Sequence, residues 1–134
     1  MPRTGRRLLI VDDDPNEVLF LRNAFDGAVS PIDIRHVDTG EAALAEIPVF
    51  HPDLVLLDLN MPGMDGYDVL GRIRGDDDTQ GLPTLIFSSS ERQEDVDRSY
   101  RSRANAYVVK PRSFEGYRQL AENIERFWYE TARL

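Results

Sequence analysis

The sequence predicts an α/β fold, a three-layer sandwich in which five parallel strands lie between two layers of helices. Three observations lead to this prediction. Short apolar runs alternate with segments of helical spacing, about five times along the 134 residues. Most of these runs are apolar at every position, which is typical of strands buried on both faces of a parallel sheet. Polar residues with chemical capacity directly follow four of the runs.

The first half of the chain holds three expected strands and two expected helices. The strands are Leu8–Val11, Ile32–Val37 and Leu54–Leu57. The first helix runs from Pro15 to about Asp26, and the second begins after Thr39, whose hydroxyl can accept a hydrogen bond from an unpaired N–H of the first turn. The residues at helical spacing on their inner faces are Val18, Leu21 and Phe25, then Ala42, Ala43 and Ile47.

The second half holds two expected strands and three expected helices. The strands are Thr84–Phe87 and Ala106–Val109, and the helices are Gly66–Arg74, Glu91–Arg103 and a last one that begins after Ser113. The apolar faces are Val69, Leu70 and Ile73 in the first helix, Val96 and Tyr100 in the second, and Tyr117, Leu120, Ala121, Ile124, Phe127 and Trp128 in the third. The second of these helices is rich in arginine and has the weakest apolar face.

The pattern of each strand indicates its place in the sheet. Ile32–Val37 alternates apolar and polar residues, so it belongs at an edge, whereas the fully apolar runs belong in the centre. This assignment fits the flavodoxin-like strand order 2-1-3-4-5, in which the first and third strands are neighbours at the switch point of the topology.

Length and charge limit the classes of protein that the chain can belong to. We expect one domain over residues 1–134, with a core from about 7 to 131 and no output domain. The net charge of −8 speaks against nucleic-acid binding, and the absence of cysteine excludes a thiol nucleophile or a cysteine-ligated metal. The basic start, residues 1–7, precedes an apolar run of only four residues, too short for an export signal or a membrane span. We therefore expect a cytoplasmic protein with no membrane segment.

Chemically capable side chains follow four of the expected strands. Asp12 and Asp13 come directly after the first strand, Asp58 after the third, Ser88 after the fourth and Lys110 after the fifth. Open α/β sheets hold their ligands at the carboxyl ends of their strands. Because the first and third strands are expected to be neighbours, the three carboxylates are expected to converge.

Converging carboxylates need a compensating charge. Two unit charges about 4 Å apart repel by about 4 kcal/mol at an effective dielectric constant of about 20. Either a pKa rises or a cation binds, and Mg²⁺ suits a site of one or two carboxylates. Lys110, the one lysine among 16 basic residues, adds a second positive charge. An aspartate, a Mg²⁺ site, a hydroxyl and an ammonium group together indicate phosphoryl transfer, with the aspartate as acceptor.

Each feature alone has a simpler interpretation. An acidic run is usually a solvated turn, and a serine or a Lys-Pro pair after a strand is often part of a loop. Asp14 precedes Pro15 and is expected to cap a helix without any chemical role. It is the joint placement at four strand ends that indicates a site.

Four segments resemble the motifs of the response-regulator receiver family. They are Val11–Pro15, Asp53–Gly66, Phe87–Ser89 and Tyr107–Pro111, and the spacing between them matches from about Arg7 onward. The resemblance implies that Asp58 takes a phosphoryl group from a phosphohistidine of a sensor histidine kinase, in a two-component phosphorelay. It also implies that Asp13, Asp58 and the backbone carbonyl of Asn60 bind Mg²⁺, with Asp12 acting mostly through water.

The resemblance assigns further roles around the acceptor. Lys110 is expected to pair with a phosphoryl oxygen and to precede Pro111 by a cis peptide bond. Ser88 is expected to move to hydrogen-bond the phosphate, and Tyr107 to turn inward behind it. Such regulators also catalyse their own dephosphorylation, and Asn60 lies where residues tune the phosphate lifetime, as does Ser90.

A narrower resemblance concerns possible partners. Ser88–Glu91, Asp95–Val96, Arg98–Tyr100 and Phe127–Thr131 resemble segments of small stand-alone regulators paired with bacterial phytochrome kinases. The resemblance implies homodimers formed through the fourth helix, the fifth strand and the fifth helix. The aromatic pair Phe127 and Trp128 fits either such an interface or the core.

Two other functions compete with the phosphorelay regulator. A phosphatase of the haloacid dehalogenase type also places an aspartate beside Mg²⁺, but its motif requires a second aspartate where this chain has Asn60, and it usually has a cap domain. A docking module that keeps only the fold would be expected to lose the acidic pair, Asp58 or Lys110, and all are present. We expect no dedicated external substrate, only self-catalysed phosphotransfer and autodephosphorylation.

Overall fold

The sheet of the computed structural model has the predicted architecture. The structure describes residues 6–27 and 31–131, so most of the basic start lies outside the described residues. Five parallel strands run in the order β2-β1-β3-β4-β5, which confirms the predicted topology. The strands are β1 (Arg6–Val11), β2 (Ile32–Val37), β3 (Leu54–Leu57), β4 (Thr84–Ser88) and β5 (Ala106–Val109).

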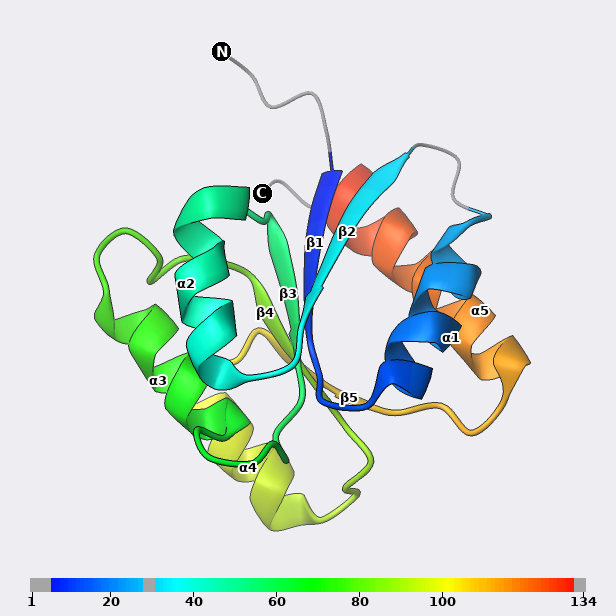
Figure 1. Ribbon diagram of the computed structural model, residues 1–134. Helices are drawn as coiled ribbons and strands as arrows, with labels where there is room; N and C mark the ends of the chain where they lie inside the picture. The colour runs from blue at the N-terminus through cyan, green and yellow to red at the C-terminus, as the bar shows by residue number, and fades with distance from the viewer. Residues whose placement is uncertain (1–5, 28–30, 132–134) are drawn as a thin grey trace.

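Helices cover both faces of this sheet. On one face lie α1 (Pro15–Phe25) and α5 (Phe114–Ile124), which pack against each other, and on the other lie α2 (Gly40–Phe50), α3 (Gly66–Gly75) and α4 (Gln93–Arg101) (Figure 1). The three-layer sandwich follows from strands that bury both faces, because each face needs its own apolar layer.

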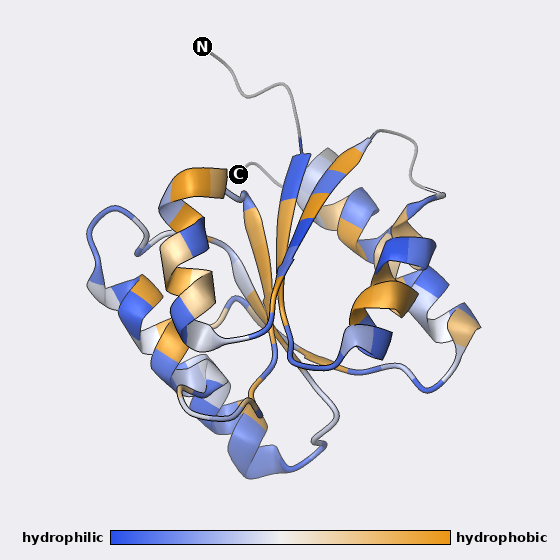
Figure 2. Ribbon diagram, in the orientation of Figure 1, coloured by the Kyte–Doolittle hydropathy of each residue, from blue (hydrophilic) through white to orange (hydrophobic). Residues whose placement is uncertain are grey.

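The core is two apolar clusters separated by the sheet. Leu8, Ile10, Leu54 and Leu56 point toward α1 and α5, whereas Leu9, Val11, Val55 and Leu57 point toward α2 and α3. Successive side chains of a strand alternate between faces, so the continuous apolar runs supply both clusters. Figure 2 shows these hydrophobic strands between the amphipathic helices. The strand β2 alternates in burial, as expected of an edge.

The predicted caps define where most helices begin. The side chains of Asp14, Thr39 and Ser113 accept hydrogen bonds from first-turn N–H groups of α1, α2 and α5, which confirms the assignment of Asp14 as a cap. The sequence interpretation missed a fourth cap. Asp65 and Asp68 form a reciprocal capping box at the start of α3.

The helix α4 is shorter than the predicted Glu91–Arg103. It begins at Gln93 without a side-chain cap and ends at Arg101, and Arg103 adopts a left-handed backbone conformation with φ of 71°. The predicted apolar stripe is weak, because Tyr100 is 50% exposed and the buried residue of this helix is Ser99.

The last predicted helix changes geometry near its end. After Ile124 the chain continues as the π-helix η1 (Glu125–Thr131), whose wider turns break the helical spacing assumed from the sequence. Trp128 therefore packs against the cluster under α1 and α5, whereas Phe127 is 54% exposed. Trp128 therefore contributes to the core, whereas an interface role for Phe127 stays a prediction.

A buried arginine fastens the opposite end of the sheet. The guanidinium of Arg74 donates to the carbonyl oxygens of Arg103, Gln80 and Leu82 and to the side-chain oxygen of Asn105, at 2.8–3.1 Å. These bonds tie α3 to the segments that precede β4 and β5. Burial lowers the pKa of Arg74, which still has hydrogen-bond partners for its charged group. None of the helices in the described ranges is both long and apolar enough to cross a membrane.

Candidate functional site

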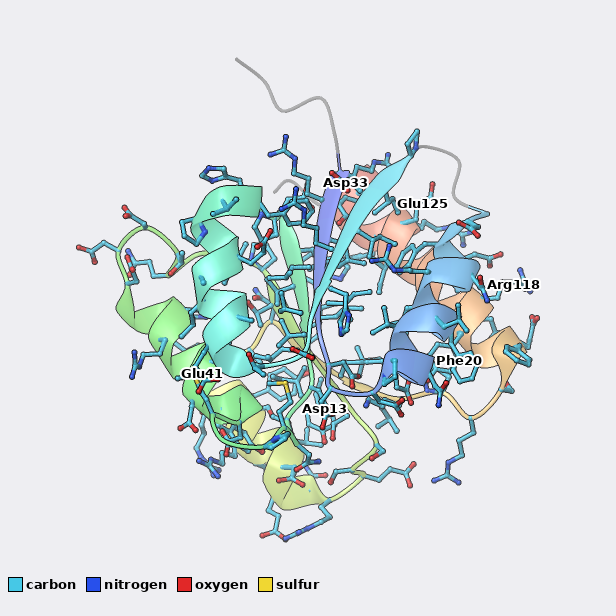
Figure 3. All side chains as sticks on the ribbon, viewed as in Figure 1. Asp13, Phe20, Asp33, Glu41, Arg118 and Glu125 are labelled. Atoms are coloured by element: carbon cyan, nitrogen blue, oxygen red, sulfur yellow. The ribbon has the colours of Figure 1, made fainter. Side chains whose placement is uncertain are left out.

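Three carboxylates meet at the carboxyl edge of the sheet. One oxygen from each of Asp12, Asp13 and Asp58 lies within 4.8 Å of the corresponding oxygens of the other two. Asp12 and Asp58 are 1% and 5% exposed, whereas Asp13 is exposed and is labelled at this edge in Figure 3. The predicted convergence of the three residues is therefore confirmed.

Backbone hydrogen bonds beyond the strand ends set this geometry. The N–H of Asp58 donates to the carbonyl oxygen of Val11 at 2.9 Å, and the N–H of Asp12 donates to that of Val37 at 3.1 Å. The parallel ladder thus continues one residue past β1 and β3. Because that pairing fixes where each Cα lies, the two buried carboxylates are held side by side despite their repulsion.

The hydrogen bonds of the buried carboxylates leave oxygens free for a cation. Asp12 Oδ1 accepts from the N–H of Asp14 at 2.9 Å, and Asp58 Oδ1 accepts from the N–H of Asn60 at 3.3 Å. Asp12 Oδ2 is buried and has no well-aligned hydrogen bond. The Lys110 ammonium lies 3.1 Å from this oxygen, but it is one charge beside three converging carboxylates, so the residues present fit a further, hard divalent cation with oxygen ligands.

Lys110 supplies one positive charge. Its ammonium lies 3.1 Å from Asp12 Oδ2 and 3.6 Å from Asp58 Oδ2, so in this structure it pairs more closely with Asp12. The backbone N–H of Lys110 donates to the carbonyl oxygen of Ser88 at 2.8 Å, which holds the backbone of Lys110 at the end of β5. Burial lowers the pKa of Lys110, but the charges of Asp58 and Asp12 outweigh burial and raise it overall, so the group stays protonated.

Asp58 is the carboxylate of the cluster whose pKa is raised. Burial, helped by the charges of Asp12 and Asp13, raises the pKa of Asp58 from 3.8 to about 6, against the opposing effects of Lys110 and of the Asn60 N–H. One ammonium therefore does not compensate for the whole negative charge, and a second cation would have a favourable place to bind.

The predicted switch residues lie on the neighbouring strands. Ser88 is fully buried at the end of β4, and its Oγ accepts from the N–H of Ser90 at 3.1 Å. The hydroxyl of Tyr107 donates to the carbonyl oxygen of Ser90 at 2.8 Å, and its ring packs on the apolar cluster beside α3. Tyr107 is thus already turned inward in this structure.

Two expectations from the family resemblance have different outcomes. The described residues contain no cis peptide bond, so the bond between Lys110 and Pro111 is trans and the expectation of a cis bond was wrong. The trans preference of a bond before proline is small, so the surroundings decide it and the dipeptide does not. Asn60 lies next to Asp58 and is exposed, while its role as a carbonyl ligand stays a prediction.

Two further residues support the site: His36, which the sequence interpretation missed, and Gly66, which ends the motif segment Asp53–Gly66 and was expected to shape the loop. His36 Nε2 lies 2.7 Å from the carbonyl oxygen of Asp12 and so helps to hold the acidic loop from the edge strand. Gly66 leaves no room for a side chain, because a Cβ there would lie 2.3 Å from the carbonyl oxygen of Asp58. The only sequence signal for His36 was a histidine in an alternating strand, a pattern that is not specific.

The fold and the site together define a class of protein, a doubly wound α/β domain with an acidic, lysine-paired pocket at its switch point. Residues 8–122 match the response regulator receiver domain family. The chain belongs to this family and is a response regulator of two-component signalling.

Curated relatives include other regulators of this kind. Over 127 residues the chain is 29% identical to the probable methanogenesis regulatory protein FilR2 of Methanothrix harundinacea. This alignment covers 90% of the chain and 82% of FilR2. It is 37% identical over 83 residues to the response regulator Rcp1 of Synechocystis, and this alignment covers 62% of the chain and 56% of Rcp1. The aligned part thus spans only slightly more than half of the length of Rcp1.

Solved structures of the same family superpose on nearly the whole chain. The phosphorylated cyanobacterial phytochrome response regulator RcpA superposes with a TM-score of 0.90 at 29% identity, covering 98% of this chain and 99% of RcpA. The Mn²⁺-bound form of Rcp1 superposes with a TM-score of 0.87 at 28% identity, covering 97% and 99%.

Proposed function

We propose that Asp58 is the phosphoryl acceptor of this response regulator and that it receives the group from a phosphohistidine of a sensor kinase. One oxygen of Asp58 forms a bond to phosphorus while the phosphorus–nitrogen bond breaks, which leaves an acyl phosphate on the protein and the imidazole on the kinase. The observation that carries the proposal is the placement of Asp58 between a lysine ammonium and two further carboxylates. RcpA, a similar protein of the same family, has been solved in a phosphorylated form.

Mg²⁺ is the proposed cofactor, held by Asp13, Asp58 and the backbone carbonyl of Asn60, with Asp12 acting through water. The all-oxygen donor set and the raised pKa of Asp58 support this assignment, and the related Rcp1 has been solved with Mn²⁺ bound. When bound, the ion would neutralise charge on the phosphoryl oxygens.

Lys110 and Ser88 are the remaining groups proposed to contact the phosphoryl group. The ammonium of Lys110 lies 3.6 Å from Asp58 Oδ2, close enough to neutralise a transferred oxygen. The Oγ of Ser88 accepts a loop N–H in this structure, so its proton is free to be donated to a phosphoryl oxygen. Tyr107 is the proposed second switch residue, since it bonds to the same loop. Self-catalysed dephosphorylation at Asp58 belongs to the same proposal.

An exposed aromatic surface beside the site supports docking of a partner. Leu19 on α1 is 53% exposed and Phe114 at the start of α5 is 75% exposed, while Phe20 stacks edge to face on Phe114 with ring centroids 5.3 Å apart. Figure 3 labels Phe20 on α1, the helix that follows the acidic loop. We propose that this surface receives a sensor histidine kinase, and phytochrome response regulators among the similar structures favour a bacteriophytochrome.

A homodimer through α4, β5 and α5 is proposed from a second exposed surface. Tyr100 and Val109 on this side are 50% and 39% exposed, so α4 and β5 offer apolar area to a partner. Size-exclusion chromatography with and without beryllofluoride tests the assembly, and a monomer elution volume in both conditions would reject it.

Intact mass spectrometry tests the acceptor. After incubation with Mg²⁺ and acetyl phosphate, the wild-type chain should gain one phosphoryl group, and the gain should vanish when the metal is chelated. Asp58→Asn should gain none, whereas Asp14→Asn, which alters only the helix cap, should be labelled like the wild type. Equal labelling of Asp58→Asn and the wild type would refute the proposal.

A further inference from the structure

A chain of hydrogen bonds joins the loop after β3 to the loop after β4 by way of α4. The N–H of Gly66 donates to the carbonyl oxygen of Leu59 at 3.0 Å, which fastens the start of α3 to the residue after Asp58. The next residue, Tyr67, donates its hydroxyl to Asp95 Oδ1 at 3.1 Å. The other carboxylate oxygen of Asp95 accepts from Ser90 Oγ at 2.6 Å. Asp95 therefore bridges the start of α3, which the Gly66–Leu59 bond ties to the loop after β3, and the loop after β4.

Further contacts hold Tyr67 and Asp95 in place. The guanidinium of Arg98 lies 3.8 Å from the centre of the Tyr67 ring, a cation–π contact. The buried Ser99 donates its hydroxyl to the carbonyl oxygen of Asp95 at 2.8 Å. The bond from Ser90, followed by that from Tyr67, lowers the pKa of Asp95, which therefore stays ionised and accepts both bonds in its charged form.

Ser90 is where the bridge meets the proposed switch. Its N–H donates to Ser88 Oγ at 3.1 Å, and its carbonyl oxygen accepts from the Tyr107 hydroxyl at 2.8 Å. Its own hydroxyl accepts from the N–H of Arg92 at 3.2 Å while it donates to Asp95. The position of Ser90 is thus coupled to Ser88, to Tyr107 and to α4.

We infer that Asp95, held by Tyr67, is a positioning residue that pre-orders the β4–α4 loop for binding a phosphoryl group. This inference rests on the proposed function of Asp58. A loop that is already ordered loses less conformational entropy when the Ser88 hydroxyl engages a ligand, so the ligand binds more tightly. Asp95 contacts neither the carboxylate cluster nor Lys110 through any hydrogen bond or ion pair found among the described residues.

A purely structural role for Asp95 needs a matched control. Asp95 lies in the first turn of α4, where any negative charge stabilises the helix N-terminus. Glu94 lies in the same turn, carries the same charge, and pairs with the exposed Arg92 without contacting Tyr67 or Ser90. The pair Asp95→Ala and Glu94→Ala therefore separates the bridge from the helix charge, and Tyr67→Phe removes one hydroxyl with little other change.

The experiment measures beryllofluoride binding by ¹⁹F nuclear magnetic resonance in saturating Mg²⁺, beside Mg²⁺ affinity measured alone by calorimetry. We expect Asp95→Ala and Tyr67→Phe each to weaken beryllofluoride binding about fivefold, while Mg²⁺ affinity stays near that of the wild type. The double variant should lose no more than about tenfold, less than the product of the single losses, because both changes break one bridge. Glu94→Ala should bind like the wild type.

Several outcomes would overturn the inference. Wild-type beryllofluoride affinity in Asp95→Ala would show that the bridge does not order the loop. An equal loss of Mg²⁺ affinity would point to general damage, and an equal loss in Glu94→Ala would point to the helix charge. Failure of the wild type itself to bind beryllofluoride would instead refute the proposed function of Asp58, so the two failures are distinguishable.

Discussion

Replacing Asp58 by asparagine should stabilise the metal-free protein at neutral pH. The carboxylate is 5% exposed and its pKa is raised from 3.8 to about 6, first by burial and then by neighbouring carboxylates. Asparagine has nearly the same shape and keeps an oxygen that can accept from the N–H of Asn60, but it carries no charge. The substitution therefore removes the cost of ionising a buried group, net of the attraction between its charge and Lys110.

The sign and size of the effect follow from proton linkage. An acid whose pKa is raised in the folded state binds its proton more tightly there, so it lowers stability above the folded pKa and loses this effect below the unfolded one. A change from 3.8 to about 6 corresponds to about 3 kcal/mol of destabilisation at pH 8. The advantage of Asp58→Asn should therefore be about 3 kcal/mol at pH 8, fall through the window between 6 and 3.8, and disappear near pH 3.8.

Urea unfolding with a chelator present measures this difference. At pH 8 the midpoint of the variant should lie about 1.5 M above that of the wild type, for an m-value of about 2 kcal/mol/M. Added Mg²⁺ should narrow the gap, because it binds the folded wild type and stabilises it by mass action. Equal midpoints of the variant and the wild type at pH 8 would show that the ionised Asp58 does not destabilise the fold. The same difference between their midpoints at pH 8 and pH 4 would show that the effect does not come from its charge.

Two further predictions concern the frame around the site. Gly66→Ala should destabilise the fold by about 3 kcal/mol in urea unfolding, because the new Cβ would lie 2.3 Å from the backbone oxygen of Asp58. Gly71→Ala has open space around it and should stabilise α3 by about 0.5–1 kcal/mol. Equal effects of the two substitutions would contradict the packing argument. Arg74→Met should lower the free energy of unfolding by about 3 kcal/mol, since four acceptors lose their hydrogen bonds to a buried, charged donor. Arg72→Met on the exposed side of α3 should change stability by less than about 0.5 kcal/mol, and a similar loss in both variants would contradict the role of the Arg74 network.

Much of the site could be predicted because it depends on local signals. A strand end is marked in the sequence by the change from apolar to polar residues, and parallel strands bring all their carboxyl ends to one edge. Asp12, Asp58, Ser88 and Lys110 could therefore be placed together once the strand order was inferred. The caps at Thr39 and Ser113 could be predicted for the same reason, since a cap acts within three residues of itself.

Contacts between distant segments could not be predicted. Nothing in the sequence relates Tyr67 to Asp95 or Arg74 to Asn105, because each pair meets only after separate helices and strands have packed. The pairing of Lys110 with Asp12 at 3.1 Å is of the same kind, since ångström differences between two neighbouring acceptors depend on side-chain packing.

The sequence alone determined which segments form strands, which strand lies at an edge and which groups follow each strand, because periodicity and strand termination are properties of short segments. The tertiary structure alone decided how strongly Asp58 is buried, which hydroxyls hold the loop beside it and where the C-terminal helix widens into η1. These depend on distances between residues far apart in the chain, and such distances are fixed only when the whole core is packed.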